Sequence, residues 1–190
     1  MPRDDGQHRA LSLADVSRLA NAIRQSDQPQ AIFETVERIA QEVIGFRLFT
    51  IMSFDAERFE VERLHSNLPD VYPPGGRKKK RGSLWAEHTL VGMKPFRATT
   101  PDGIRLAFDD HAVMTGMGLG SILNVPVAYN GRCVGTMNLT HVETWYTEAH
   151  EQVGLLLAAF VAAPLALHRS ASAGVRAHAV FEADDSASRA

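Results

Sequence analysis

The sequence has little of what several functional classes require. It contains one cysteine among 190 residues, which excludes an internal disulfide and favours a reducing compartment. Its formal net charge of −2 gives no electrostatic reason to bind nucleic acid or an anionic membrane. The longest apolar run, 153–167, is broken by Gly154 and Pro164 and is too short to span a bilayer. Because residues 1–10 also lack the apolar core of a signal peptide, we predict a cytoplasmic protein.

Motifs for metal binding and covalent catalysis are missing as well. The histidines show no spacing of the His-Glu-x-x-His type, so we predict no metal site. Cys133 lies on a predicted strand beside Val134 with no histidine nearby in sequence, and is interpreted as a small buried hydrophobe. No cofactor can be named from these residues.

The composition is that of a globular protein with one folded domain. Apolar residues make up 45% of the chain and charged residues 22%, which are ordinary values for a soluble domain. Residues 1–10 are polar and predicted to be disordered. The folded domain is expected over residues 11–167. The remaining segment, 168–190, is rich in alanine and serine and is predicted to be a disordered tail.

Residues 121–141 predict a central β-hairpin. Asn130-Gly131 is the pair that best tolerates the positive φ angles of a type I′ turn. Both faces of the two strands are mostly apolar, which indicates that other elements cover the hairpin on both sides. The simple register places Pro126 opposite Gly135, and this pair indicates a local bulge or the close approach of a covering element.

The other predicted elements follow from apolar spacing and capping residues. Ser12 and Asp15 resemble a capping box, Asp27 is a plausible cap for a second helix, and Asp109 for a later one. The predicted elements are helices over 13–23, 29–44, 84–90, 110–117 and from Thr147 onward, strands over 46–54, 59–65 and, more weakly, 105–108, and a long mobile loop over 67–81.

One pattern in the hairpin points to a family. It reads small residue-x-Leu-x-Val-Pro-Val, a short turn, then Gly-x-x-x-Gly-x-x-x-Leu. It is carried by Ser121, Leu123, Val125, Pro126, Val127, Gly131, Gly135 and Leu139. Over residues 11–167 the chain resembles the GAF domain family. The resemblance implies an α/β (α+β) fold, with the N- and C-terminal helices on one face of an antiparallel sheet and a ligand pocket under loops and short helices on the other.

The resemblance also implies where a ligand would bind. The segment 67–120 would cover the pocket, and within it Arg97, Thr99 and His111 are predicted ligand contacts. A guanidinium offers two parallel hydrogen bonds to a carboxylate or phosphate. Asn124 and Asn138 interrupt apolar strands and are also candidates. The simple register places these two on opposite faces, so only one can face the pocket unless a bulge intervenes.

Two functional classes remain open. The first is a sensory or regulatory module that binds a small anionic or polar ligand. The alternative is a stand-alone enzyme acting on a small polar metabolite, with His111 and Asp109 or Asp110 as acid and base. The resemblance also implies a homodimer through the terminal helices, whose apolar stripes include Leu19 and Phe160.

Overall fold

The computed structural model describes the backbone of residues 8–187 and the side chains of residues 8–169. The elements in chain order are α1 (Leu13–Ile23), α2 (Gln30–Val43), β1 (Leu48–Asp55), β2 (Glu60–Ser66), β3 (Arg77–Lys79), α3 (Leu84–Ala86), the π-helical turn η1 (Glu87–Val91), β4 (Phe96–Ala98), α4 (Pro101–Ala107), α5 (His111–Gly116), β5 (Ser121–Tyr129), β6 (Arg132–His141) and α6 (Glu148–Ala187).

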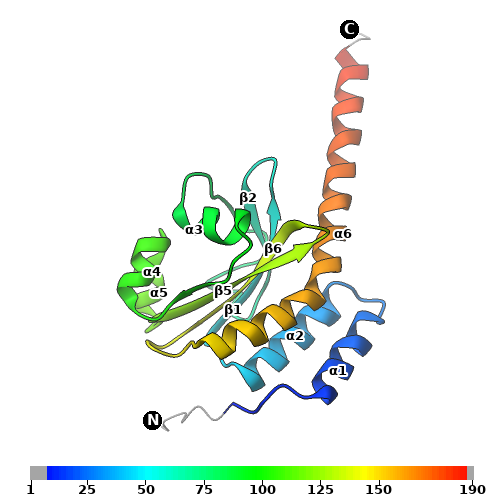
Figure 1. Cartoon of the computed structure of the whole chain (residues 1–190). Helices are drawn as coiled ribbons and strands as arrows, with labels where there is room; N and C mark the ends of the chain where they lie inside the picture. The colour runs from blue at the N-terminus through cyan, green and yellow to red at the C-terminus, as the bar shows by residue number, and fades with distance from the viewer. Residues whose placement is uncertain (1–7, 188–190) are drawn as a thin grey trace.

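The architecture is a six-stranded antiparallel sheet between two layers of helices. The strand order is β3-β2-β1-β6-β5-β4, with the β5–β6 hairpin beside β1 in the middle. Helices α1, α2 and α6 lie on one side of the sheet, and α3, α4 and α5 on the other (Figure 1). The predicted α+β fold is confirmed.

The main core lies between the sheet and the terminal helices. Helix α2 buries an apolar face that includes Ile32, Val36 and Ile39, as its helical spacing predicts. Helix α6 approaches the sheet closely at Gly154. A Cβ added to this residue would lie only 2.8 Å from the Cγ2 atom of Val125. This packing leaves the opposite sheet face to the short helices and loops.

The predicted hairpin register is wrong beyond the first two pairs. Tyr129 pairs with Arg132 as expected, but Val127 pairs with Gly135, which leaves Val134 as an extra residue in a β-bulge. The bulge shifts every later pair by one position, so Asn124 lies directly opposite Asn138. Both amides therefore face the same side of the sheet.

Several local predictions also need correction. Residues 105–108 do not form a strand: Arg105–Ala107 belong to α4, which begins after Thr100, whose hydroxyl accepts a hydrogen bond from the Gly103 amide. The loop 67–81 contains β3, which pairs with β2. The N-cap positions of α2 and α5 are occupied by Pro29 and Asp110 rather than by Asp27 and Asp109, and neither residue makes a side-chain capping hydrogen bond. The capping box of Ser12 and Asp15 is confirmed.

Helix α6 is the longest element and continues to Ala187. Pro164 lies inside it, and the helix changes direction along its length (Figure 1). Its part Glu148–Arg169 is long and apolar enough to cross a membrane by length and composition, a criterion that core helices of soluble proteins also meet. Residues 1–7 and 188–190 of the predicted disordered ends lie outside the described residues, and the boundary at 167 remains a prediction.

Candidate functional site

A cavity lies between the sheet, whose edge strand is β3, and the cover formed by α3 and α5. Counted together with the space open to solvent, its volume is about 550 Å³. It is lined by Leu48, Thr50, Met52, Val61, Arg63, Tyr72, Lys78, Lys80, Trp85, Phe108, Asp110, Met114, Ile122, Asn124, Asn138 and Thr140. About half of these side chains are apolar or aromatic, and the polar ones are grouped.

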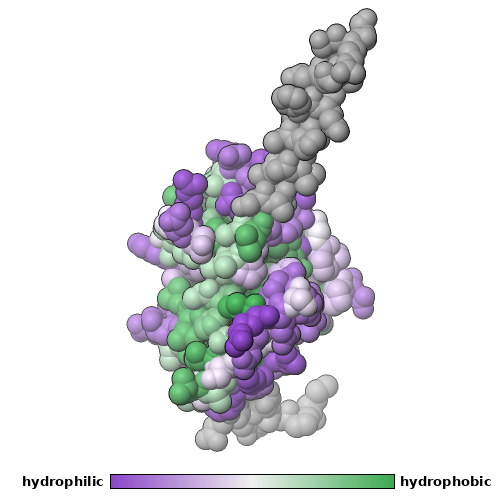
Figure 2. Space-filling view, turned by 90° about the vertical axis from the view of Figure 1, so that its right-hand side faces the viewer, coloured by the Kyte–Doolittle hydropathy of each residue, from purple (hydrophilic) through white to green (hydrophobic). Residues whose placement is uncertain are grey.

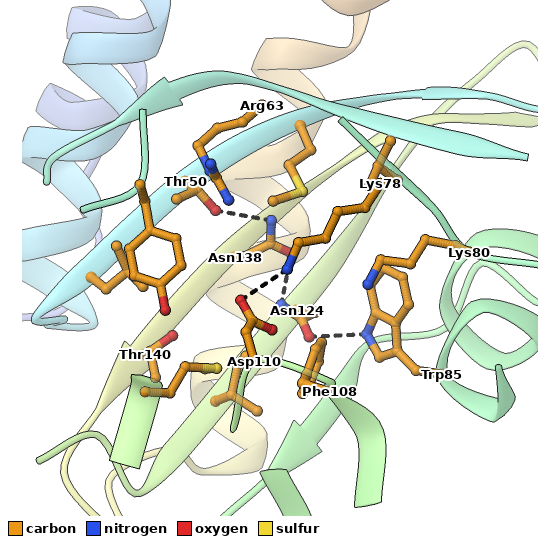
Figure 3. Close-up of a pocket in the computed structure, with 16 residues that line it drawn as sticks. Thr50, Arg63, Lys78, Lys80, Trp85, Phe108, Asp110, Asn124, Asn138 and Thr140 are labelled. Atoms are coloured by element: carbon orange, nitrogen blue, oxygen red, sulfur yellow. Dashed lines mark hydrogen bonds and ion pairs between the residues drawn. The ribbon is translucent and has the colours of Figure 1, made fainter. Parts of the chain in front are cut away.

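A chain of hydrogen bonds crosses the floor of the cavity (Figure 3). The indole Nε1 of Trp85 donates to Asn124 Oδ1 (3.0 Å), and Asn124 Nδ2 donates to Asn138 Oδ1 (2.7 Å). Asn138 Nδ2 then donates to Thr50 Oγ1 (3.2 Å). The chain ties α3 to three neighbouring strands. Each amide nitrogen carries two hydrogens, so a second donor remains on both asparagines.

Arg63 forms the cationic wall of the cavity. Its side chain is 7% exposed, its Nη1 donates to the carbonyl of Pro73 (3.0 Å), and its guanidinium lies 5.1 Å from the centre of the Tyr72 ring. Within the part of the chain whose side chains are described, Arg63 Nε and the Tyr72 hydroxyl have no hydrogen-bond partner. Unpaired polar atoms at buried positions are uncommon and costly.

Burial moves the pKa values of these groups in opposite directions. It lowers the pKa of the Arg63 guanidinium and raises that of the Tyr72 phenol. An arginine starts from so high a value that it stays charged at neutral pH. Tyr72 stays protonated because its pKa rises from an ordinary value that is already alkaline. Both groups therefore present hydrogen-bond donors.

Two lysines lie at the mouth of the cavity. Lys78 Nζ is 3.1 Å from Asp110 Oδ2, so an ion pair joins β3 to the start of α5. Lys80 lies over the Trp85 ring, 5.3 Å from its centre, and burial lowers the pKa of its ammonium group. Among the described lining residues, three cations therefore face one carboxylate.

A second bulge places Arg63 and His65 on opposite faces of β2. Met52 pairs with Arg63 while the preceding residue, Ile51, pairs with His65, so Leu64 is the extra residue. Arg63 therefore shares the face of Met52, which lines the cavity. His65 turns to the opposite face, where it lies beside Phe49.

The predicted site residues divide into two groups. Asp110, Asn124 and Asn138 line the cavity. Arg97, Thr99, Asp109 and His111 lie outside that lining. The Arg97 Nε atom instead pairs with Glu151 Oε1 at 2.5 Å, which links β4 to α6. The structure thus brings together one carboxylate and two amides of the predicted set.

Sequence reasoning did not place Arg63, Tyr72, Lys78 or Lys80 among the ligand contacts, although all four line the cavity. One of them left a signal: Arg63 is two residues from Val61 in an alternating strand, which places it on the same buried face. A basic residue at a buried strand position is unusual. The lysines belong to the run 77–81, whose sequence resembles that of a solvated loop. An edge strand of three residues is too short to show an alternation of apolar and polar residues.

Metal and thiol chemistry find no support in the described residues. Among them, no group of three or more His, Cys, Asp or Glu side chains could hold a metal ion. Cys133 is buried and its thiol donates to the Gly135 carbonyl. Burial raises its pKa to about 11, so it is a thiol rather than a nucleophilic thiolate at neutral pH.

With the fold and cavity defined, comparison with known proteins identifies the class. The family model described as "GAF domain" matches residues 28–165, and the chain therefore belongs to the GAF domain family. Domains of this family occur in sensory and regulatory proteins that bind small molecules. A search of curated proteins gave no significant match.

Solved structures share the fold at low identity. The GAF domain of a phosphoenolpyruvate-protein phosphotransferase from Coxiella burnetii is 16% identical, with a TM-score of 0.69 over 85% of this chain and 96% of that one. The corresponding Acinetobacter domain is 13% identical, with a TM-score of 0.66 over 85% and 99%. The GAF domain of a sensor histidine kinase from Bacillus halodurans is 14% identical, with a TM-score of 0.60 over 76% and 98%. These likenesses support the fold alone.

Proposed function

We propose that this protein is a sensory or regulatory module that binds a small anionic or polar ligand in the cavity between the sheet and its cover. The observation that carries the proposal is Arg63. Its Nε–H is buried without a partner in the described structure, as is the Tyr72 hydroxyl, and both side chains line the cavity. An anion would satisfy both donors, and the surplus of positive charge in the lining favours one.

The rest of the lining supports a binding role. The bonded chain from Trp85 to Thr50 holds both amides and the indole in place without a ligand. A preformed polar floor with apolar walls is typical of small-molecule sites. We propose that Asn124, Asn138 and Asp110 contribute to ligand recognition. Asp110 would act together with Lys78, with which it forms an ion pair.

A thermal-shift screen of metabolites tests this proposal. A ligand that binds only the folded state adds about 2.7 kcal/mol at a hundredfold excess over its dissociation constant. For a domain near this size, that corresponds to a rise of roughly 5–10 °C in the unfolding midpoint. We expect such shifts from carboxylates, phosphates or polar heterocycles, and we expect Arg63→Met to abolish them.

Arg97→Met is the matched control, because Arg97 lies outside the cavity lining and pairs with Glu151. The control should keep the ligand-induced shift of the wild type. The proposal fails if no compound stabilises the protein, or if the shifts survive in Arg63→Met and are lost in Arg97→Met.

The geometry of the cavity supports the catalytic alternative less well than it supports binding. Of its three candidate residues, only Asp110 lines the cavity, and its carboxylate is paired with Lys78. His111 begins α5 outside the lining, so an acid–base pair across the cavity is not assembled by these residues. Binding is therefore the function that we put forward.

The proposal includes a homodimer in the cytoplasm. On α6, the exposed residues Leu156, Ala159, Ala163 and Leu167 recur at helical spacing. Figure 2 shows apolar residues gathered on this side of the molecule. Pairing of two such faces would remove the stripe from water. The buried free thiol of Cys133 agrees with a reducing compartment.

A further inference from the structure

We propose that the ligand is an aromatic carboxylic acid, with its carboxylate bound to Arg63 and Tyr72 and its ring packed toward Trp85. This inference rests on the proposed binding function and names the ligand class for the same site. Two independent features support it. The first is the pair of buried donors without a partner, and the second is the set of aromatic and thioether side chains in the rest of the lining.

Two buried donors that lack a partner suit the acceptors of a carboxylate. Arg63 Nε–H and Tyr72 O–H belong to side chains that are 7% and 8% exposed, and both groups line the cavity. A carboxylate has two oxygens, so one can accept from each donor. A phosphate dianion would bring a third terminal oxygen and a second charge into a cavity in which about half of the lining side chains are apolar or aromatic, and an unsatisfied charge is costly there.

The protonation states suit this arrangement. Because burial raises the pKa of Tyr72, the phenol keeps its proton and can donate to an anion. Arg63 is additionally held by the Pro73 carbonyl and the Tyr72 ring, so its Nε–H direction is fixed before a ligand arrives. A preorganised donor lowers the entropic cost of binding.

The other walls suit a planar ring. Met52, Trp85, Phe108 and Met114 line the cavity, and the Trp85 and Phe108 rings lie 5.7 Å apart at a tilt of 58°. Aromatic side chains and thioethers both interact favourably with aromatic ligands. Hydrogen bonding of the Trp85 indole to Asn124 fixes the orientation of that wall.

The cation and the aromatic wall lie far enough apart for one small molecule to bridge them. Figure 3 shows Arg63 and Trp85 on opposite sides of the pocket, with Lys78 and Asp110 between them. Arg63 is on β2, and Trp85 is bonded to Asn124 on β5, three strand positions away. At about 4.8 Å per strand the two anchoring strands are about 14 Å apart. Because both side chains reach into this span, we assign the remaining space to a one- or two-ring acid.

Isothermal titration calorimetry on the full chain tests the ligand class. The compounds are benzoate, indole-3-carboxylate and 2-naphthoate, each compared with its neutral amide, together with cyclohexanecarboxylate and phenyl phosphate. We expect at least one aromatic acid to bind at least about tenfold more tightly than its amide, because a hydrogen-bonded charge is lost in the amide. The saturated acid should bind about two- to tenfold more weakly than benzoate, and phenyl phosphate more weakly still.

Tyr72→Phe is the decisive variant. It removes a hydroxyl that bonds to no described residue, so the unliganded unfolding midpoint should not fall. The affinity for the aromatic acid should fall about 10- to 100-fold, the usual loss for a hydrogen bond to a charged group. The matched control is Tyr129→Phe, whose ring is 51% exposed at the hairpin turn. It should bind as the wild type does.

The outcomes separate this inference from the proposed function. Amides or phenyl phosphate that bind as tightly as the acids, or a Tyr72→Phe variant of unchanged affinity, would overturn the aromatic-acid assignment. In those cases binding that depends on Arg63 would still support a small-molecule module. If no compound in either screen binds in a manner that depends on Arg63, both proposals are wrong.

Discussion

Asp15 shows how single side chains tie the start of the chain to the domain. Its carboxylate is buried and accepts from Arg9 at 2.5 and 2.7 Å and from the Ser12 amide and hydroxyl at 2.9 and 2.7 Å. Arg9 and Arg18 also bond to Glu42 on α2. The hydrogen bonds from Arg9 hold the pKa of Asp15 well below its usual range.

We predict that Asp15→Asn lowers the free energy of unfolding at pH 7 by roughly 1–2 kcal/mol, as loss of a charged cap does. The folded-state pKa of Asp15 is depressed, so its stabilisation is complete above the unfolded value near 3.9 and is lost as the pH falls below it. In urea unfolding, the difference in the free energy of unfolding between wild type and Asp15→Asn should be smaller at pH 3 than at pH 7. Asp102→Asn, an exposed carboxylate on α4, is the control and should change little at either pH.

At the scale of the elements, the central hairpin depends on Gly135. A Cβ at this position would overlap the Met52 carbonyl oxygen on β1 and lie 2.8 Å from Leu165 on α6. The absence of a side chain lets the bulged strand lie against both neighbours. The same bulge aligns Asn124 with Asn138. It therefore sets both the register of the hairpin and the hydrogen bond between the two amides in the pocket floor.

Gly135→Ala should lower the free energy of unfolding by about 1–3 kcal/mol or more, because backbone atoms cannot move aside as a flexible side chain can. Gly116→Ala provides the matched control: an added Cβ there meets no atom within 4 Å, so stability should hold or rise slightly. Urea denaturation of both variants makes the comparison. Equal stability of the two variants would contradict the close approach of Gly135 to the Met52 carbonyl oxygen.

The fold could be predicted from local signals, because the Asn130-Gly131 turn, the α2 apolar spacing and the Ser12 cap are each encoded within a few residues. The register could not. Val134 is as good a strand residue as its neighbours, so nothing in its type marks it as the bulged one.

The site was predictable only where polar residues interrupt apolar strands, as Asn124 and Asn138 do. For arginines, local sequence misleads. Arg97 lies next to polar residues that suit a ligand, yet it pairs with Glu151, whereas Arg63 lies in a charged strand and shares the cavity face of Val61. Which arginine lines the cavity is decided by the packing of distant elements.

For the whole molecule, the outer face of α6 is the surface on which the proposed dimer depends. Leu155 and Leu156 are 37% and 42% exposed, and Leu167 is 71% exposed. The buried side of the same helix packs on β5 and β6 through residues such as Leu157 and Val161. An apolar helix with one covered face and one open face is suited to pair with a second copy.

We predict that light scattering at tens of micromolar gives twice the chain mass of 20.9 kDa. Leu156→Glu should shift the mass to that of a monomer, since a charge would be buried in an apolar interface. Leu106→Glu is the control, because this exposed leucine lies on α4 at the other side of the sheet. A monomeric wild type, or a dimer that tolerates Leu156→Glu, would contradict the proposed interface.

The hydrogen bond that anchors Trp85 has an optical consequence. The chain has two tryptophans, and they lie on opposite faces of the sheet: Trp85 lines the cavity, while Trp145 stacks on His141 and donates to the Ile44 carbonyl near the terminal helices. Indole emission depends on local polarity and on nearby quenching groups. The protein therefore carries an intrinsic fluorophore inside its pocket and a second one outside it, so ligand occupancy and global unfolding are separate spectroscopic signals.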